Sequence, residues 1–312
     1  MIELQHVTKR YGSVEAVKDL SFSVPQGQIV GLLGQNGAGK TTTLNMLTGY
    51  CPPTEGTVTV DGLDMLTQAR ACKRRIGYLP EQPPLYPEMT IREYLSFVCR
   101  LREVRGSKIR SHVSDIMQRC GIEGMDDKLV GSLSKGYRQR VGFAQALCGD
   151  PPVIVLDEPT VGLDPRQVVE IRELMAQLGR DHTVIFSSHI LSEIQQLCSR
   201  VVILHKGKLV KEADMQELNG ENGGMCLRAS IACGEERLMP ALRGLPCIRK
   251  AKVLPRKEKG ITEVELRFAG NPDGDPRRQL FNLLCGMDAP IYMLMPVRET
   301  LEELFLRATD EG

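Results

Sequence analysis

Apolar and polar residues alternate over much of the first 24 positions of the chain. Residues 2–7 and 16–24 follow this two-residue period, and a turn that exposes the ring of Tyr11 separates them. Such a period is typical of antiparallel strands with one buried face. Residues 29–33 are almost entirely apolar and predict a buried strand, and residues 41–48 then predict a helix.

Two later strands are predicted to end in polar side chains. Residues 153–158 and 183–189 each begin with an apolar run and finish in polar residues. Apolar runs of this length are typical of parallel strands that are covered on both faces. Between residues 88 and 150 the apolar positions have helical spacing, and Thr90 is suited to cap the first helix. This part predicts a helical subdomain.

A change in composition divides the chain. Residues 218–224 are rich in Gly and Asn and predict a linker between a domain at 1–217 and an accessory domain at 225–312. The order strand, helix, strand, strand, helix, strand predicts a small ferredoxin-like α+β fold for the accessory domain, followed by one more helix. Its expected elements are residues 225–232, 235–243, 247–255, 261–268, 276–285, 291–296 and 299–307.

Composition limits the kinds of partner. The 312 residues carry a formal net charge of +1, which gives no electrostatic argument for binding nucleic acid. Ten cysteines without a C-x-x-C pair, and no signal peptide, predict free thiols in a reducing cytosol. No apolar run approaches the roughly 20 residues of a membrane span. We therefore expect any role at a membrane to depend on a partner.

The first candidate site is a glycine-rich stretch between a strand and a helix. Residues 34–42 fit the pattern G-x-x-x-x-G-K-[ST] of a phosphate-binding P-loop. Glycines let successive backbone N–H groups turn toward an anion, and the helix N-terminus adds its positive end. Lys40 is expected to reach the outer phosphates, and Thr41 to bind Mg²⁺. The predicted nucleotide-binding residues here are Gly34, Asn36, Gly37, Ala38, Gly39, Lys40, Thr41 and Thr42.

The polar ends of the two later strands supply candidate catalytic groups. Asp157 is expected to hold Mg²⁺, directly or through water, and Glu158 to orient or deprotonate an attacking water. His189 follows the next strand, where ligands bind in open α/β sheets, and it can reach a γ-phosphate there. Solvated turn carboxylates and a structural histidine are the alternatives, but the P-loop favours catalysis.

A second candidate anion site precedes the last helix of the helical subdomain. Ser134 and Gly136 stand at the start of this helix, where backbone N–H groups are free to bind an anion. The sequence does not require this helix start to bind the same phosphates as the P-loop of its own chain.

These stretches together resemble the ATPase subunits of ABC transporters. Residues 34–42, 133–139, 153–158 and His189 look like the Walker A, signature, Walker B and H-loop motifs, in the same order and spacing. Residues 162–164 resemble the D-loop, and Tyr11 resembles the aromatic residue that stacks on adenine. The resemblance covers about residues 1–215. The signature and the C-terminal extension look more specifically like the ABC-2-type export group, which includes gliding-motility and drug-export subunits.

The chain departs from this family at two motifs. Most signatures read Leu-Ser-Gly-Gly-Gln, whereas Lys135 and Tyr137 stand at the third and fifth positions here. Glu81 stands where the Q-loop usually has Gln, and Gln82 follows it. Glu81 is the predicted Q-loop residue and a candidate Mg²⁺ ligand, and Gln82 is the alternative.

The resemblance implies the following fold and function. The fold would be an α/β P-loop NTPase core with an antiparallel β subdomain, an α-helical subdomain and the accessory domain. The cofactors would be ATP and Mg²⁺. Two copies, or this chain and a like ATPase subunit, would enclose two ATP molecules, and Ser134 and Gly136 of each would cover the nucleotide of the other.

The resemblance also implies where such an ATPase works. Dimer closure would drive transport, expected to be export, through a separate integral membrane subunit. The chain would be cytoplasmic and peripheral on the inner face of the cell membrane. A soluble ABC-type ATPase without a membrane partner is the alternative, although such proteins commonly carry two cassettes or long coiled insertions, and this chain has neither.

Overall fold

The computed structural model describes residues 1–218, 226–255, 260–268, 275–296 and 301–310. The chain divides into two compact units, one comprising Met1–Ala213 with Phe305–Gly312 and the other Asp214–Leu304. The sequence predicted Phe305–Gly312 as part of the accessory domain, whereas the contacts group these residues with the first unit. Residues 219–224 of the expected linker lie outside the described residues. No helix within the described ranges combines the length and the apolar character needed to span a bilayer.

A six-stranded sheet forms the centre of the first unit, with the strand order β10-β9-β3-β8-β7-β6. The five strands from β9 to β6 are parallel, as the continuous apolar runs predicted. Every residue of β7 and β8 is buried. The strands are β3 (Ile29–Leu33), β6 (Ile76–Leu79), β7 (Val153–Leu156), β8 (Thr183–Ser188), β9 (Arg200–His205) and β10 (Lys208–Asp214).

An antiparallel sheet with the order β2-β1-β4-β5 forms the second layer of this unit. Its apolar residues share one hydrophobic core with the six-stranded sheet. The predicted antiparallel subdomain is therefore confirmed. Its strands are β1 (Ile2–Tyr11), β2 (Val14–Val24), β4 (Glu55–Val60) and β5 (Leu63–Asp64).

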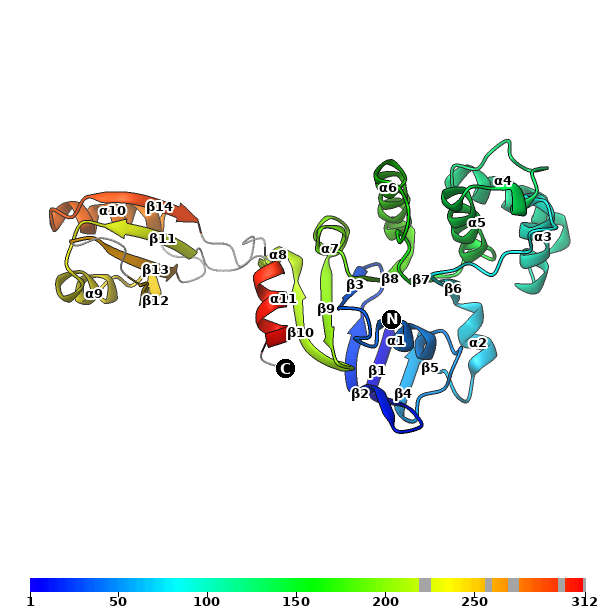
Figure 1. The fold of residues 1–312 in the computed structure, drawn as a ribbon, viewed down its shortest axis with the longest axis horizontal. Coiled ribbons are helices and arrows are strands. Elements are labelled where there is room, and N and C mark those ends of the chain that lie inside the picture. The colour runs from blue at the N-terminus through cyan, green and yellow to red at the C-terminus, as the bar shows by residue number, and fades with distance from the viewer. Residues whose placement is uncertain (219–225, 256–259, 269–274, 297–300, 311–312) are drawn as a thin grey trace. The chain divides into compact units, whose positions relative to one another are not determined.

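The helical subdomain lies beside β6 in Figure 1. Thr90 and Glu93 form a reciprocal capping box at the start of α3, which confirms Thr90 as the cap. Gly77 lets α5 approach β6 closely, because a Cβ at this position would lie 2.0 Å from the carbonyl oxygen of Ala146. The helices of the subdomain are α3 (Ile91–Leu101), α4 (Gly106–Arg119) and α5 (Lys135–Leu147), and a 3₁₀ turn spans Val130–Ser132.

Four further helices belong to the first unit. The helix α1 follows β3, and α2 precedes β6. The helices α6 and α7 flank β8 along the chain. Their bounds are α1 (Lys40–Leu47), α2 (Ala69–Arg74), α6 (Pro165–Asp181) and α7 (Leu191–Leu197), and the short α8 (Met215–Leu218) follows β10.

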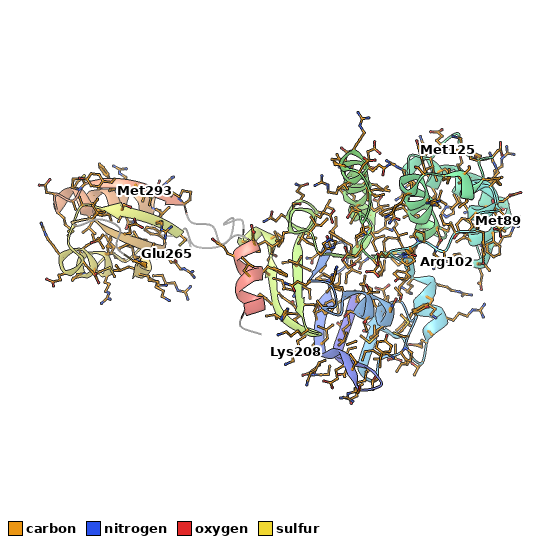
Figure 2. All side chains as sticks on the ribbon, viewed as in Figure 1. Met89, Arg102, Met125, Lys208, Glu265 and Met293 are labelled. Carbon is orange, nitrogen blue, oxygen red and sulfur yellow. The ribbon has the colours of Figure 1, made fainter. Side chains whose placement is uncertain are left out.

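The second unit is a four-stranded antiparallel sheet with the order β12-β13-β11-β14. Its helices α9 and α10 alternate with the strands in the predicted order βαββαβ, and their apolar sides share one core with the sheet. The elements are β11 (Cys226–Ile231), α9 (Glu235–Arg243), β12 (Ile248–Val253), β13 (Thr262–Phe268), α10 (Pro276–Gly286) and β14 (Ile291–Pro296). The helix α11 (Leu301–Asp310) follows, and its residues from Phe305 on group with the first unit. Figure 2 shows side chains on this unit, including Glu265 and Met293.

Candidate functional site

The loop between β3 and α1 has the backbone of an anion-binding turn. Gly37 and Gly39 have φ angles of 81° and 99°, in the left-handed region that glycine adopts without strain. A Cβ on Gly39 would also lie 2.7 Å from the carbonyl oxygen of Ala16, so a larger residue has no room there. Gly39 is the N-cap of α1, and Lys40 is its first residue. The positive end of this helix therefore opens toward the loop.

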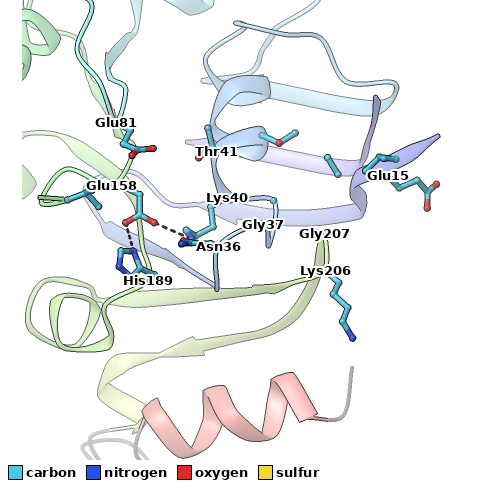
Figure 3. A pocket seen from close by; sticks show the side chains of 15 residues that line it. Glu15, Asn36, Gly37, Lys40, Thr41, Glu81, Glu158, His189, Lys206 and Gly207 are labelled. Carbon is cyan, nitrogen blue, oxygen red and sulfur yellow. Dashed lines mark hydrogen bonds and ion pairs between the residues drawn. The ribbon is translucent and has the colours of Figure 1, made fainter. Parts of the chain in front are cut away.

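Lys40 connects the loop to the ends of two neighbouring strands. Its Nζ lies 2.7 Å from the carbonyl oxygen of Gly34 and 3.2 Å from Oε1 of Glu158. The other oxygen of Glu158 is hydrogen-bonded to Nδ1 of His189 at 2.8 Å. Lys40 and Glu158 are 6% and 8% exposed, so this contact is largely shielded from water. Figure 3 shows the three side chains converging.

The backbone at Glu158 fixes the direction of its carboxylate. Glu158 has a φ of 45°, which is uncommon for a residue with a side chain. Its N–H donates to Oγ of Ser187 at 2.8 Å, which ties the end of β7 to β8. The carboxylate is thereby held toward Lys40 and His189.

Asp157 is buried beside the P-loop. Its Oδ1 accepts a hydrogen bond from Oγ of Ser187 at 2.6 Å and from Oγ1 of Thr41 at 3.2 Å. The pKa of Asp157 is raised above its ordinary value because the carboxyl group is buried. The hydrogen bonds from Ser187 and Thr41 offset part of this rise. Hydroxyl and carboxylate oxygens are ligands that Mg²⁺ accepts, and Mg²⁺ usually takes only one or two carboxylates besides phosphate and water. The residues present therefore fit a nucleotide-bound Mg²⁺ ion.

These side chains open into a pocket of about 600 Å³. It brings together nine of the predicted site residues, which are Asn36, Gly37, Gly39, Lys40, Thr41, Thr42, Glu81, Glu158 and His189. Gln82, the alternative to Glu81, is not among the lining residues. Three predicted residues do not line the pocket, which are Gly34, Ala38 and Asp157. The Gly34 carbonyl accepts a hydrogen bond from Lys40, and the Asp157 carboxylate accepts one from Thr41.

The pocket also has lining residues that the sequence analysis missed. They are Val14, Glu15, Ala16, Val161, Lys206 and Gly207. The turn between β9 and β10 reaches the P-loop through the Gly207 N–H, which donates to the Ala38 carbonyl at 3.1 Å. The Lys18 N–H in turn donates to the Gly207 carbonyl at 2.8 Å. Only folding brings these segments together, so no local pattern identifies them.

Tyr11 lies at the end of β1, outside the pocket lining. Tyr11 is 50% exposed, and its hydroxyl is hydrogen-bonded to Sγ of Cys51 at 3.7 Å. This hydrogen bond raises the pKa of Tyr11, burial adds to the rise, and the Thr42 side chain lowers it by a hydrogen bond to the same hydroxyl. Thr42 does line the pocket, so Tyr11 borders it.

The signature residues lie at the start of α5 and do not line the pocket of their own chain. Ser134 is exposed and caps α5, with its Oγ accepting from the Tyr137 N–H at 3.4 Å. Gly136 is buried against α6, since a Cβ there would lie 2.6 Å from the side chain of Gln167. Nε2 of Gln139 donates to the Pro159 carbonyl at 2.9 Å, which links α5 to the loop after Glu158.

A family model described as "ABC transporter" matches residues 17–161. A second model, described as "AAA domain, putative AbiEii toxin, Type IV TA system", matches residues 130–194. Both matches fall in the first unit, and both include the strand that carries Asp157 and Glu158.

Two named relatives extend the comparison. The chain is 39% identical over 224 residues to the ABC transporter ATP-binding protein NatA of Bacillus subtilis, covering 70% of this chain and 91% of NatA. It is 36% identical over 309 residues to the Nod factor export ATP-binding protein I of Burkholderia pseudomallei, covering 99% of this chain and 96% of that protein.

A solved structure agrees with these relatives. It is a dimeric, post-hydrolysis state of the ATP-binding cassette MJ0796 bound to ADP and Pi, with a TM-score of 0.64 and 27% sequence identity. The match covers 69% of this chain and 99% of that one. With the P-loop, the Glu158–His189 contact and nearly full-length relatives in agreement, the chain belongs to the ATP-binding subunits of ABC transporters, which bind and hydrolyse ATP.

Proposed function

We propose that this chain binds Mg-ATP in the pocket at the P-loop and uses its hydrolysis to drive export through a membrane partner. The observation that carries the proposal is the convergence of Lys40, Glu158 and His189 at the ends of three adjacent strands. The P-loop backbone and Lys40 bind the phosphates, and the ring of Tyr11 stacks on the base.

Thr41, Asp157 and Glu81 are the residues that would hold Mg²⁺. The ion would neutralise charge on the phosphates when bound. Thr41 and Asp157 support this assignment, because their oxygens lie 3.2 Å apart. Glu81 lines the same pocket from the segment after β6.

Glu158 acts on the attacking water in this proposal. A carboxylate within reach of a water molecule can orient it and accept its proton. His189 is hydrogen-bonded to Glu158 through Nδ1, so its Nε2 remains to face the γ-phosphate and stabilise the charge that develops there. Lys40 supplies a positive charge at the same end of the pocket.

The site is completed by a second copy of the chain. Ser134 and Gly136 lie outside the pocket of their own subunit, although their helix start is suited to bind an anion. In a twofold-symmetric dimer, each subunit would place these residues over the nucleotide of the other. ATP then favours the closed dimer, because only that state supplies both sets of phosphate contacts. Hydrolysis reopens it.

The closure and reopening of the dimer are passed on to a membrane subunit. The loop at residues 83–88 joins the pocket residue Glu81 to the helical subdomain, so it is suited to pass on changes at the γ-phosphate. Export is supported by the relative whose name describes Nod factor export and which matches nearly the whole chain. The subunit would then work in the cytoplasm, on the inner face of the membrane.

The substitution Glu158→Gln tests this function. It removes the proton acceptor but keeps the size of the side chain, so hydrolysis should fall by at least about 100-fold while ATP still binds. The variant should also accumulate as a dimer in size-exclusion chromatography with Mg-ATP. Glu15→Gln is the matched control, because Glu15 also lines the pocket but pairs with Arg10 and Lys18. A fully active and purely monomeric Glu158→Gln variant would overturn the assignment.

A further inference from the structure

The ring of Tyr11 has a cation on one face. Nζ of Lys9 lies 5.2 Å from the centroid of the Tyr11 ring, within the distance at which a cation is attracted to the π-electrons. Lys9 and Tyr11 are two residues apart in β1, and the register of β1 against β2 shifts between Lys9 and Arg10.

The Lys9 ammonium is anchored on its far side. Nζ donates to the carbonyl oxygen of Pro52 at 2.7 Å. The segment that carries Pro52 is itself joined to β1, because the Thr54 N–H donates to the Thr8 carbonyl at 2.8 Å and the Arg10 N–H donates to Oγ1 of Thr54 at 3.0 Å. Lys9 is thus held between the ring and a fixed backbone oxygen.

The other end of the ring is held by the same segment. The Tyr11 hydroxyl is hydrogen-bonded to Sγ of Cys51, which directly precedes Pro52. Lys9 and Cys51 therefore contact a face and the tip of the ring, although Tyr11 as a whole residue remains half exposed. A ring held in this way loses little conformational freedom when a flat ligand stacks on it.

We propose that Lys9 is a positioning residue for the base of the nucleotide. It closes one face of the Tyr11 ring, holds the ring in place and leaves the opposite face for the purine. This inference rests on the proposed stacking role of Tyr11. The contribution of Lys9 acts through the ring, so it should concern the base and not the phosphates.

A purely electrostatic role for Lys9 predicts something different. Any cation near the pocket attracts the triphosphate at long range. Lys18 carries the same charge on the neighbouring strand β2, is 52% exposed at its side chain and pairs with Glu15, which lines the pocket. Lys18→Met is therefore the matched control for the loss of one positive charge.

The test compares ATP with inorganic tripolyphosphate by isothermal titration calorimetry on the full chain. Lys9→Met should weaken ATP binding about two- to fivefold, the range for an exposed cation–π contact, and leave tripolyphosphate binding unchanged. Lys9→Arg should restore the affinity for ATP. In a Tyr11→Ala background, Lys9→Met should have no further effect, since the two residues act as one unit.

Two results would overturn the inference. One is wild-type ATP affinity in Lys9→Met while Tyr11→Ala weakens binding, which would leave the stacking role intact and remove Lys9 from it. The other is an equal loss of ATP and tripolyphosphate affinity in Lys9→Met and Lys18→Met, which would show a general charge effect. If Tyr11→Ala itself binds ATP normally, the proposed stacking fails, whatever Lys9 does.

Discussion

Lys40 and Glu158 are the two charged side chains most deeply buried in the pocket lining, and they contact each other. A buried charge is costly unless it is paired, and here the two opposite charges face each other at 3.2 Å. The pair joins the group proposed to bind phosphate to the group proposed to act on water.

The substitution Lys40→Ala should abolish tight ATP binding. It removes the ammonium that would reach the outer phosphates and leaves Glu158 without its buried cation. We expect the affinity to fall by about 100-fold or more, measured by calorimetric titration, because charge-assisted hydrogen bonds to phosphate are among the strongest in proteins. Lys206→Ala is the control, since Lys206 lines the pocket but Figure 3 shows its side chain directed away from Lys40. Wild-type affinity in Lys40→Ala would refute the P-loop assignment.

Among the pocket-lining residues, the sequence predicted those that lie in recognisable motifs and missed six others. The P-loop, Asp157, Glu158 and His189 sit next to strands whose apolar runs are visible in the sequence, so their common location followed from the rule for parallel sheets. Gly207 gives no such signal. It reaches the pocket through hydrogen bonds to Ala38 and Lys18, which are distant in the chain.

Among the elements, those with a clear apolar pattern were predicted, and two without such a pattern were missed. The helix α3 has a buried apolar face and a clear cap, so both its type and its start were anticipated. The elements α2 and β5 were missed. Only Cys72 is buried in α2, and β5 has two residues, so neither contains enough apolar residues to show a period.

The capping box of α3 predicts a pH dependence of stability. The Thr90 N–H donates to Oε2 of Glu93 at 2.9 Å, and this bond lowers the pKa of Glu93. A carboxyl group with a lowered pKa in the folded state stabilises the fold above its ordinary pKa of about 4.3. That contribution disappears as the pH falls through the lowered value.

Urea unfolding of the wild type and of Glu93→Gln measures this contribution. The difference in the free energy of unfolding between the two proteins should be present at pH 7 and should shrink progressively below about pH 4.3. Gln can keep the capping hydrogen bond, so the pH-dependent part reports the charge alone. A difference that stays constant over this range would show that Glu93 does not act through its ionised form.

At the scale of the whole molecule, the chain consists of two compact units. All the residues proposed to bind nucleotide lie in the first unit, and the second unit contains a separate hydrophobic core. From the linker composition and the βαββαβ order, the sequence predicted two domains with a linker at residues 218–224. It could not indicate that the end of α11, from Phe305 on, groups with the first unit. This grouping depends on contacts between residues far apart in the chain.

A site shared between two copies predicts that activity depends on protein concentration. If Ser134 and Gly136 act on the nucleotide of a second subunit, the monomer lacks a complete site and the ATPase activity per mole should rise with concentration. A steady-state phosphate-release assay over about three decades of concentration would measure this rise. Constant activity per mole from a protein that remains monomeric throughout would contradict the shared site.

The contacts of Lys40 have a consequence for how substitutions at Glu158 are interpreted. A lysine ammonium has three N–H donors, and Nζ of Lys40 already contacts the carbonyl oxygens of Gly34 and Gln35 and the carboxylate of Glu158. In the proposed site a phosphate oxygen displaces one of them, so the carboxylate would compete with the nucleotide for Lys40. Glu158→Gln would weaken this competition as well as remove the proposed proton acceptor. Tighter ATP binding by that variant would thus contain a contribution from the monomer, separate from any gain due to dimer closure.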